Sequence, residues 1–407
     1  MISCEDGTPY GPAENTARLF LDLLGDAVAV EASAEVARGI PKTAATTEEV
    51  STADEEETTE LSVAVYRATT GDYPASPSEW DRYDGFLLPG SLSAAYGNEE
   101  WIRALRDTIR TEIVGRRRKC LAVCFGHQIL AHSFGERGGK GGMGGGNEED
   151  ERREQDGEFA RIAVQDSCAH SDETASASAS AGSVSEDCIG SFKDMGRASR
   201  CPAGFQFGRR EFQLTPEGIA LFRCSSNMTK EPQDSVRADD ANNIGCVAPV
   251  EPSESSLQLL YTHGDMVEML PACAVSLGGN SDVPVQSAAY FRSEAEANRF
   301  RDICRQHLPS SLSDGNNNSS ANETDKEEDV QTVLPTPFAF TFQAHPEYRS
   351  GLGEKTFLDI RDKLKRDGAF PAEELDGFAD DAKRRSEEVG KDSLDAALMV
   401  GRWLGWF

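Results

Sequence analysis

The alternation of short apolar segments with amphipathic stretches is the feature that most constrains the fold of this 407-residue chain. Residues 61–66, 84–88 and 119–123 have the apolar character of short buried strands, whereas residues 14–28 and 98–113 repeat apolar side chains at helical spacing. Strands that alternate with helices in this way form a parallel sheet with helices on both faces. The pattern predicts an α/β fold with a mostly parallel central sheet flanked by helices.

The same patterning resumes in the second half of the chain, and helical patterning closes it. We expect a strand and turn at 210–218, a strand, a loop and a short helix at 257–271, strands at 284–290 and 337–347, and helical segments at 354–367 and 397–407.

Four polar stretches interrupt the pattern, and only 38% of the chain is hydrophobic. Such segments cannot bury enough apolar surface to offset the entropy lost on ordering. We therefore expect one domain over residues 1–407 with disordered insertions at 32–60, 138–200, 225–254 and 309–332.

The net charge of -29 argues against a nucleic-acid partner and against an anionic membrane surface, since both require clustered Lys and Arg. No run of about 18 apolar residues exists, so no membrane span is expected. The start, MISCEDGTPYGP, lacks the basic and apolar parts of a signal peptide. Ten cysteines without a CxxC pair indicate free thiols in a reducing cytoplasm. The six histidines are not spaced like a zinc site, and we expect neither a metal nor a cofactor.

The sharpest local motif is AVCFGHQ, residues 122–128, in which an apolar strand ends at a cysteine and a helix starts at once. A tight strand-to-helix turn of this kind exposes a nucleophile above the sheet. The helix N-terminus favours a thiolate at Cys124, and backbone N–H groups there can hold an oxyanion. The alternative is a buried structural cysteine, and this motif alone does not decide between the two.

A second motif, FQAHPE at residues 342–347, places a histidine just after an apolar strand and a carboxylate two residues later. A thiol nucleophile needs a base, and the base needs an orienting group. Alone, His345 has the character of a structural histidine. Together, Cys124, His345 and Glu347 form a chemically complete triad.

A third motif, LLPGS at residues 87–91, ends a short strand in Pro-Gly-Ser. The backbone N–H of Gly90 is a candidate second oxyanion donor, and an ordinary turn is the alternative.

The motifs YDGFLLPGS, AVCFGHQ, YTHGDMVEMLP and FQAHPE occur in this order, and together they resemble the class I glutamine amidotransferase domain. The nearest subgroup is that of stand-alone, GMP-synthase-like amidotransferases, which includes the gamma-glutamyl peptidases. The chain departs from the family at Ala122, where Gly is usual. Its first strand is also expected to be short, because only three residues precede Cys4.

The resemblance implies roles for several residues. Cys124 would be the nucleophile, and His345 with Glu347 would complete the triad. The N–H groups of Gly90 and Phe125 would form the oxyanion hole. Gln128 and Ser91 would contact the substrate, whereas His263 and Asp265 are expected to be structural or peripheral.

These features predict a cysteine-dependent hydrolase or transferase that acts on the γ-glutamyl amide bond of glutamine or γ-glutamyl peptides. The expected partner is this small-molecule substrate. One alternative is a glutaminase subunit that donates ammonia to a separate synthase subunit. Another is a catalytically silent binding module, although a silent module has no need of Cys, His and Glu together.

Overall fold

Most of the apolar segments become strands and most of the amphipathic segments become helices in the part of the chain that the structure describes. The structure is a computed structural model, and it describes residues 1–7, 9–37, 61–135, 196–227, 255–307, 334–349, 351–368 and 370–406. All of these residues belong to one unit, made of residues 1–135 and 192–407. A second unit, residues 136–191, lies outside the described part, so the single-domain prediction for the whole chain stays a prediction.

The strands and helices follow one another along the whole described chain. The strands are β1 (Ile2–Ser3), β2 (Tyr66–Arg67), β3 (Phe86–Leu88), β4 (Cys120–Val123), β5 (Arg197–Arg200), β6 (Gln206–Leu214), β7 (Ser256–His263), β8 (Asp265–Met269), β9 (Ala274–Gly279), β10 (Ser287–Tyr290) and β11 (Ala339–Phe342). The helices are α1 (Ala13–Ala37), α2 (Pro77–Trp80), α3 (Glu100–Thr108), α4 (Phe125–His132), α5 (Pro216–Asn227), α6 (Glu294–His307), α7 (Leu352–Arg366), α8 (Ala372–Arg384) and α9 (Ser386–Leu404). None of these described helices has the length and apolar character needed to cross a membrane.

The central sheet has seven strands in the order β3-β4-β11-β10-β9-β6-β7. Strands β3, β4 and β11 are parallel neighbours, whereas the remaining neighbours pair antiparallel. It follows that only β6 and β10 run against the common direction. The α/β class is confirmed, and the sheet is mostly but not entirely parallel in strand direction. Two short pairs, β1 with β2 and β5 with β8, lie beside it.

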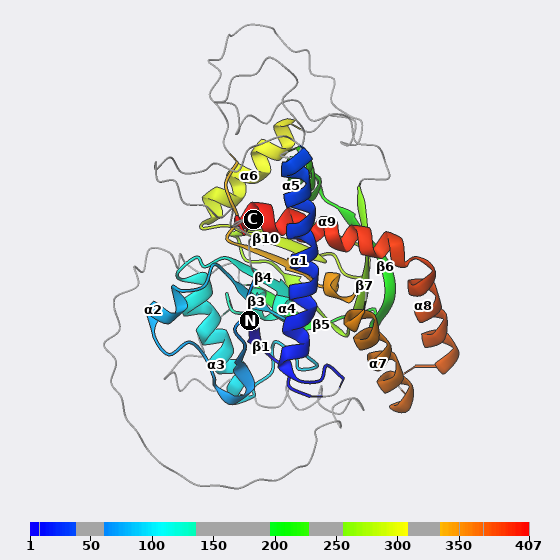
Figure 1. The fold of residues 1–407 in the computed structure, drawn as a ribbon. Helices are drawn as coiled ribbons and strands as arrows, with labels where there is room; N and C mark the ends of the chain where they lie inside the picture. The colour runs from blue at the N-terminus through cyan, green and yellow to red at the C-terminus, as the bar shows by residue number, and fades with distance from the viewer. Residues whose placement is uncertain are drawn as a thin grey trace, which may run out of the picture. The chain divides into compact units, whose positions relative to one another are not determined.

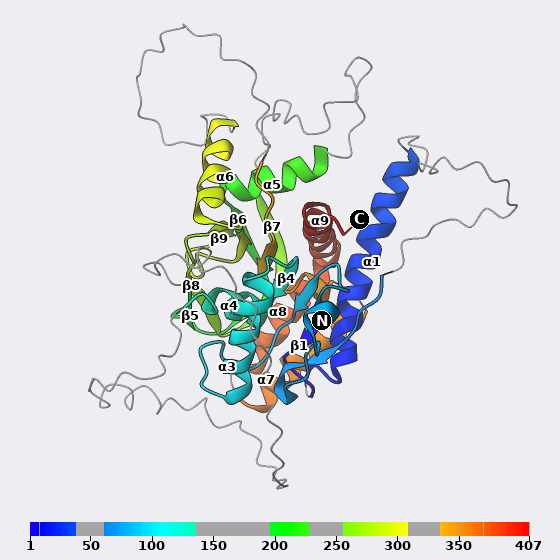
Figure 2. The ribbon, with the colours of Figure 1, turned by 90° about the vertical axis from the view of Figure 1, so that its left-hand side faces the viewer.

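Alternate residues of the strands enter two different cores, one on each face of the sheet. Leu121 and Val123 of β4 pack in the core that α1, α5, α6 and α9 cover. Cys120 and Ala122 face the other core, which α3 and α4 cover. Figure 2 shows α1 and α9 on one side of the strands and α3 and α4 on the other. Burial on both faces explains why β3, β4 and β11 are apolar at every position except Thr341, rather than alternating between apolar and polar residues.

The sheet curls so that its last strand approaches the end of β11. The backbone N–H of His345, just beyond β11, donates to the carbonyl of Leu260 in β7, 2.8 Å away. Tyr10, Phe207 and Tyr348 belong to a third apolar cluster, to which α7 and α8 contribute. In Figure 1 these two helices lie beside β6 and β7. The curl brings residues distant in sequence to the carboxyl ends of the parallel strands.

Three expected elements differ from the structure. Residues 61–65 form no strand, and β2 covers only two residues because its partner β1 has only two. The short helix expected within 257–271 is wrong, since β8 occupies this place and pairs antiparallel with β5. The helix expected at 98–113 also changes type after Thr108 and continues as a π-helix, Ile109–Val114.

The expected insertions lie mostly outside the described residues, but their bounds are too wide. Residues 32–37 continue helix α1, residues 197–200 form β5, and residues 225–227 complete α5. The parts of 32–60, 138–200, 225–254 and 309–332 beyond these segments fall outside the described chain, apart from Gly196, which precedes β5.

Candidate active site

A tight strand-to-helix turn lies between β4 and α4, at the position where the sequence predicts a nucleophile elbow. Cys124 has φ 53° and ψ −110°, a backbone conformation that non-glycine residues seldom adopt. Its N–H donates to the carbonyl of Phe342, 2.7 Å away, and its own carbonyl accepts from the N–H of Gln128. A strained residue held by hydrogen bonds on both sides is typical of a functional turn. The side chain of Cys124 stands at the N-terminus of α4.

Glycine is required beside the elbow. A Cβ at Gly126 would overlap the carbonyl oxygen of Leu88, at the end of β3. The N–H of Gly126 donates to the carbonyl of Pro89, 3.1 Å away. This close approach of α4 to the end of β3 sets the distance between the cysteine and the LLPGS segment.

His345 reaches the same edge of the sheet from the neighbouring strand. β11 pairs in parallel with β4, with Phe342 opposite Val123, so the residues that follow each strand meet. The His345 Nδ1 atom lies 2.8 Å from Oε1 of Glu347, and both side chains are buried. In the described part of the chain, Oε2 of Glu347 has no hydrogen-bond partner. The carboxylate is therefore directed at the imidazole.

The environment of His345 favours its protonated form. Burial by itself lowers the pKa of His345, but the charges of Glu347 and Cys124 and their hydrogen bonds outweigh it and raise the pKa to about 10. The protonated imidazole of His345 is thereby favoured between the side chains of Glu347 and Cys124. The three predicted triad residues are thus brought together.

Gly90 lies against both Cys124 and His345. A Cβ built on Gly90 would be 3.0 Å from Cε1 of His345 and 3.5 Å from Cβ of Cys124. The contact with Cys124 would be an ordinary one, but the imidazole of His345 would have to shift slightly to admit any side chain larger than that of glycine. Within the described residues, the backbone N–H groups of Gly90 and Phe125 have no acceptor. The role of these two groups as oxyanion donors stays a prediction.

The two predicted substrate-binding side chains are engaged elsewhere. The amide nitrogen of Gln128 donates to the carbonyl of Asp265 at 2.9 Å and to Oε1 of Gln343 at 3.1 Å. The hydroxyl of Ser91 donates to Oε1 of Glu5 at 2.7 Å. These bonds fasten the loops around the site, and direct contact of either side chain with a substrate stays a prediction.

His263, the last residue of β7, and Asp265, the first residue of β8, were expected to be structural or peripheral. The ring nitrogen Nδ1 of His263 is 2.8 Å from the carbonyl oxygen of Asp265. Burial lowers the pKa of His263 to about 3, so its ring is neutral. The phenol of Tyr96 donates to the Asp265 carboxylate at 3.1 Å. This arrangement joins the loop after β3 to the β7–β8 link.

Three residues near the triad were missed in the sequence. The hydroxyl of Thr262 lies 3.0 Å from Nε2 of His345, and the ring of Tyr348 stacks on the imidazole with centroids 4.2 Å apart. The phenol oxygen of Tyr10 is 3.7 Å from where a Cβ of Gly90 would be. Thr262 lies within the YTHGD motif and Tyr348 directly follows the FQAHPE motif, so their positions in the sequence could have pointed to them. No motif in the sequence around Tyr10 indicated that it would lie near the site.

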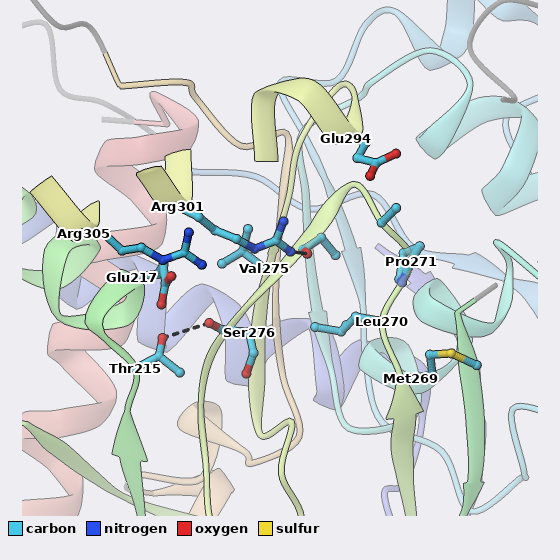
Figure 3. Close-up of a pocket in the computed structure, with 12 residues that line it drawn as sticks. Thr215, Glu217, Met269, Leu270, Pro271, Val275, Ser276, Glu294, Arg301 and Arg305 are labelled. Carbon is cyan, nitrogen blue, oxygen red and sulfur yellow. Dashed lines mark hydrogen bonds between the residues drawn. The ribbon is translucent and has the colours of Figure 1, made fainter. Parts of the chain in front are cut away.

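A separate cavity of about 530 Å³ contains none of the predicted site residues. Its walls come from α5, α6, β9 and the segment after β8. Figure 3 shows Arg301 and Arg305 on one side, with Glu217 nearby, and the hydrogen bond from the Thr215 hydroxyl to the carbonyl of Ser276. The Arg301 guanidinium donates to the carbonyl of Ala274, so it already has a backbone partner.

Known proteins similar to this chain include plant peptidases. A stretch of 80 residues is 35% identical to gamma-glutamyl peptidase 5 of Arabidopsis thaliana and covers 20% of this chain and 31% of that protein. A stretch of 76 residues is 33% identical to gamma-glutamyl peptidase 3 of the same species and covers 19% of this chain and 30% of that protein. The chain thus spans about a third of the length of these relatives. No protein-family model matches it.

Solved structures with a related arrangement carry amidotransferase names. A glutamine amidotransferase of Thermotoga maritima has a TM-score of 0.41 and 13% identity, over 84% of this chain and 86% of that one. A glutamine amido transferase of Methylobacillus flagellatus has the same TM-score and identity, over 84% of each chain. A likeness at this level carries no conclusion about chemistry.

Proposed function

We propose that this chain, as a member of the class I glutamine amidotransferase-like family, hydrolyses γ-glutamyl amide bonds through a thioester on Cys124. One observation carries the proposal. Cys124 occupies a strained turn after β4, and the hydrogen-bonded pair of His345 and Glu347 follows the adjacent parallel strand. The local similarity to gamma-glutamyl peptidases supports a γ-glutamyl substrate over other amides.

The residues divide the chemistry between them. The Cys124 thiol gives its proton to Nε2 of His345, and the thiolate attacks the γ-carbonyl carbon. The N–H groups of Gly90 and Phe125 hold the oxygen that becomes negative. The proton on His345 then passes to the leaving amine nitrogen as the C–N bond breaks. Water, activated by the same imidazole, resolves the thioester and releases glutamate.

Other described cysteines are poor competitors for this role. Burial raises the pKa of Cys120 to about 12 and the pKa of Cys273 to about 11, and it also raises the pKa of Cys4. A thiol held protonated is a weak nucleophile. A glutamine-mimicking electrophile should therefore label Cys124 ahead of these three.

The direct test is glutamate release by the purified protein from glutamine and from γ-glutamyl dipeptides, without ATP and without a second protein. The variant Cys124→Ala should release none. Because the loss of one oxyanion donor alone costs about 3 kcal/mol of transition-state stabilisation, loss of the nucleophile should cost more. Release by Cys124→Ala at the wild-type rate would refute the proposal.

Two further outcomes separate the alternatives. Hydrolysis that appears only after a synthase subunit is added would identify an ammonia donor. Binding of γ-glutamyl compounds with no turnover and no labelling of Cys124 would identify a silent binding module.

A further inference from the structure

The imidazole of His345 has a hydrogen-bond partner that the chemistry above does not use. The hydroxyl oxygen of Thr262, on β7, lies 3.0 Å from Nε2, and both residues are buried. Nε2 is also the nitrogen that must take the thiol proton, because Nδ1 is bound to Glu347. In the proposed chemistry, Nε2 of His345 therefore interacts with both the thiol of Cys124 and the hydroxyl of Thr262.

Strand β7 holds His345 at two points. The backbone N–H of His345 donates to the carbonyl of Leu260, and Thr262, two residues further along β7, contacts the ring. Tyr348 covers one face of the imidazole, with an angle of 4° between the ring planes. The ring thus has a hydrogen-bond partner at each nitrogen and an aromatic partner on one face, which leaves it little freedom to turn.

We propose that Thr262 is a positioning residue that serves Nε2 of His345 in both protonation states. When Nε2 carries a proton, the hydroxyl oxygen accepts a hydrogen bond from it. When Nε2 is neutral, the hydroxyl rotates and donates to the ring nitrogen. A hydroxyl can do both because it has one donor and two acceptor sites. This inference rests on the proposed function, in which Nε2 gains and loses a proton in each turnover.

The proton balance gives Thr262 no chemical step of its own. In acylation the S–H bond of Cys124 breaks and an Nε2–H bond forms, and this proton then moves to the leaving nitrogen. In deacylation water supplies a proton to Nε2, and the thiolate leaving group takes it back. The side chain of His345 is buried in the structure, and an unpaired ring nitrogen there would be costly. Thr262 keeps Nε2 paired and in plane.

The charged groups around His345 determine the expected pH effect. Cys124, Glu347 and His263 act on the charge of His345, Tyr348 stacks on its ring, and Tyr10 lies across Gly90. A hydrogen bond to a charged group is stronger than one to a neutral group. Removal of the Thr262 hydroxyl therefore destabilises the protonated form of His345 more than the neutral form, and the pKa of His345 falls. The alkaline limb of the pH profile of kcat/KM then moves to lower pH.

The matched pair of variants is Thr262→Val, which keeps the shape and removes the hydroxyl, and Thr262→Ser, which keeps the hydroxyl. Two readouts are taken across pH: kcat/KM for glutamate release, and the rate at which iodoacetamide alkylates Cys124, located by peptide mass spectrometry. Thr262→Val should lose about ten- to a hundredfold in kcat/KM. In kcat/KM its alkaline limb should shift to lower pH, whereas in alkylation, which follows the thiolate, the rise of the rate with pH should shift to higher pH. Thr262→Ser should recover most of the rate and of both pH profiles.

A purely structural role for Thr262 predicts a lower melting temperature with an unchanged pH profile, and that result would overturn the inference. So would a Thr262→Ser variant as impaired as Thr262→Val. Should Thr262→Val not fold, Thr262→Ala removes the same hydroxyl, and the Ser variant still tests rescue. The alkylation readout does not depend on the substrate. A wild-type protein that releases no glutamate, yet shows the Thr262-dependent shift in alkylation, would refute the proposed function while supporting this inference.

Discussion

Replacement of Glu347 by Gln changes the charge beside His345 with little change in shape. In the folded protein Oε1 of Glu347 lies 2.8 Å from Nδ1 of His345, and both side chains are buried. Gln keeps an oxygen that can accept from Nδ1, but it removes the negative charge. The variant therefore tests the charge of the pair rather than its packing.

The size of the effect follows from the bond that is weakened. A buried hydrogen bond to a charged group contributes about 1.5–3 kcal/mol, which corresponds to roughly 10- to 150-fold in kcat/KM. The charge of Glu347 also helps to raise the pKa of His345 to about 10. Without that charge, burial is opposed only by Cys124 and by a weaker hydrogen bond to the Gln oxygen, so the pKa of His345 should fall toward its ordinary value of about 6.5.

The same shift makes a prediction for stability. Because the folded-state pKa of His345 is raised, its pairing with Glu347 stabilises the native protein fully below about pH 6.5 and is lost as the pH rises toward about 10. The free energy of unfolding, measured with urea, should fall over this range in the wild type. In Glu347→Gln this part of the pH dependence should be much smaller.

The assay is kcat/KM for glutamate release as a function of pH, with Glu354→Gln as the matched control. Glu354 is exposed in the first turn of α7 and undergoes the same change of charge. Its variant should match the wild type, whereas Glu347→Gln should be slower throughout and lose activity at lower pH on the alkaline side. Equal rates and coincident profiles for the Glu347→Gln variant and wild type would refute the triad.

Further substitutions test the surroundings of the triad. Gly90→Ala should lower kcat about tenfold with little change in melting temperature, since its Cβ would lie 3.0 Å from the His345 ring and displace it slightly. Gly126→Ala should lower the free energy of unfolding by about 1–3 kcal/mol in denaturant titrations, because its Cβ would overlap the backbone of β3. Gly25→Ala, in open space on α1, should instead stabilise the protein by up to about 1 kcal/mol. Glu5→Gln should raise KM or lower kcat several-fold, because Glu5 accepts two hydrogen bonds from the loop that follows β3. Steady-state kinetics measure both constants, and unchanged values would show that Glu5 does not position this loop for catalysis.

The local parts of the site were predictable from the sequence because each is encoded within a few residues. An apolar strand followed at once by Cys124 and a helix specifies the elbow, and the spacing of His345 and Glu347 specifies their pairing. Parallel neighbours then bring the strand ends together. Motifs of this length can be recognised even when long polar stretches separate them in the sequence.

The missed contacts depend on the curl of the sheet. Thr262 lies at the opposite end of the strand order from β3, and only the curl carries it to His345. Strand β8 was mistaken for a helix because its partner β5 lies within a stretch with the composition of an insertion. The antiparallel members β6 and β10 had no local signal of their direction. Long-range pairing decides these features, and no single segment encodes it.

The most direct test of the account is to trap the covalent intermediate. The protein is mixed with a γ-glutamyl dipeptide, quenched in acid within the first turnover and digested, and the peptides are analysed by mass spectrometry. The account predicts a γ-glutamyl thioester on the peptide that contains Cys124, absent from Cys124→Ala. Glutamate release that continues with no adduct on Cys124, or with the adduct on another cysteine, would contradict it.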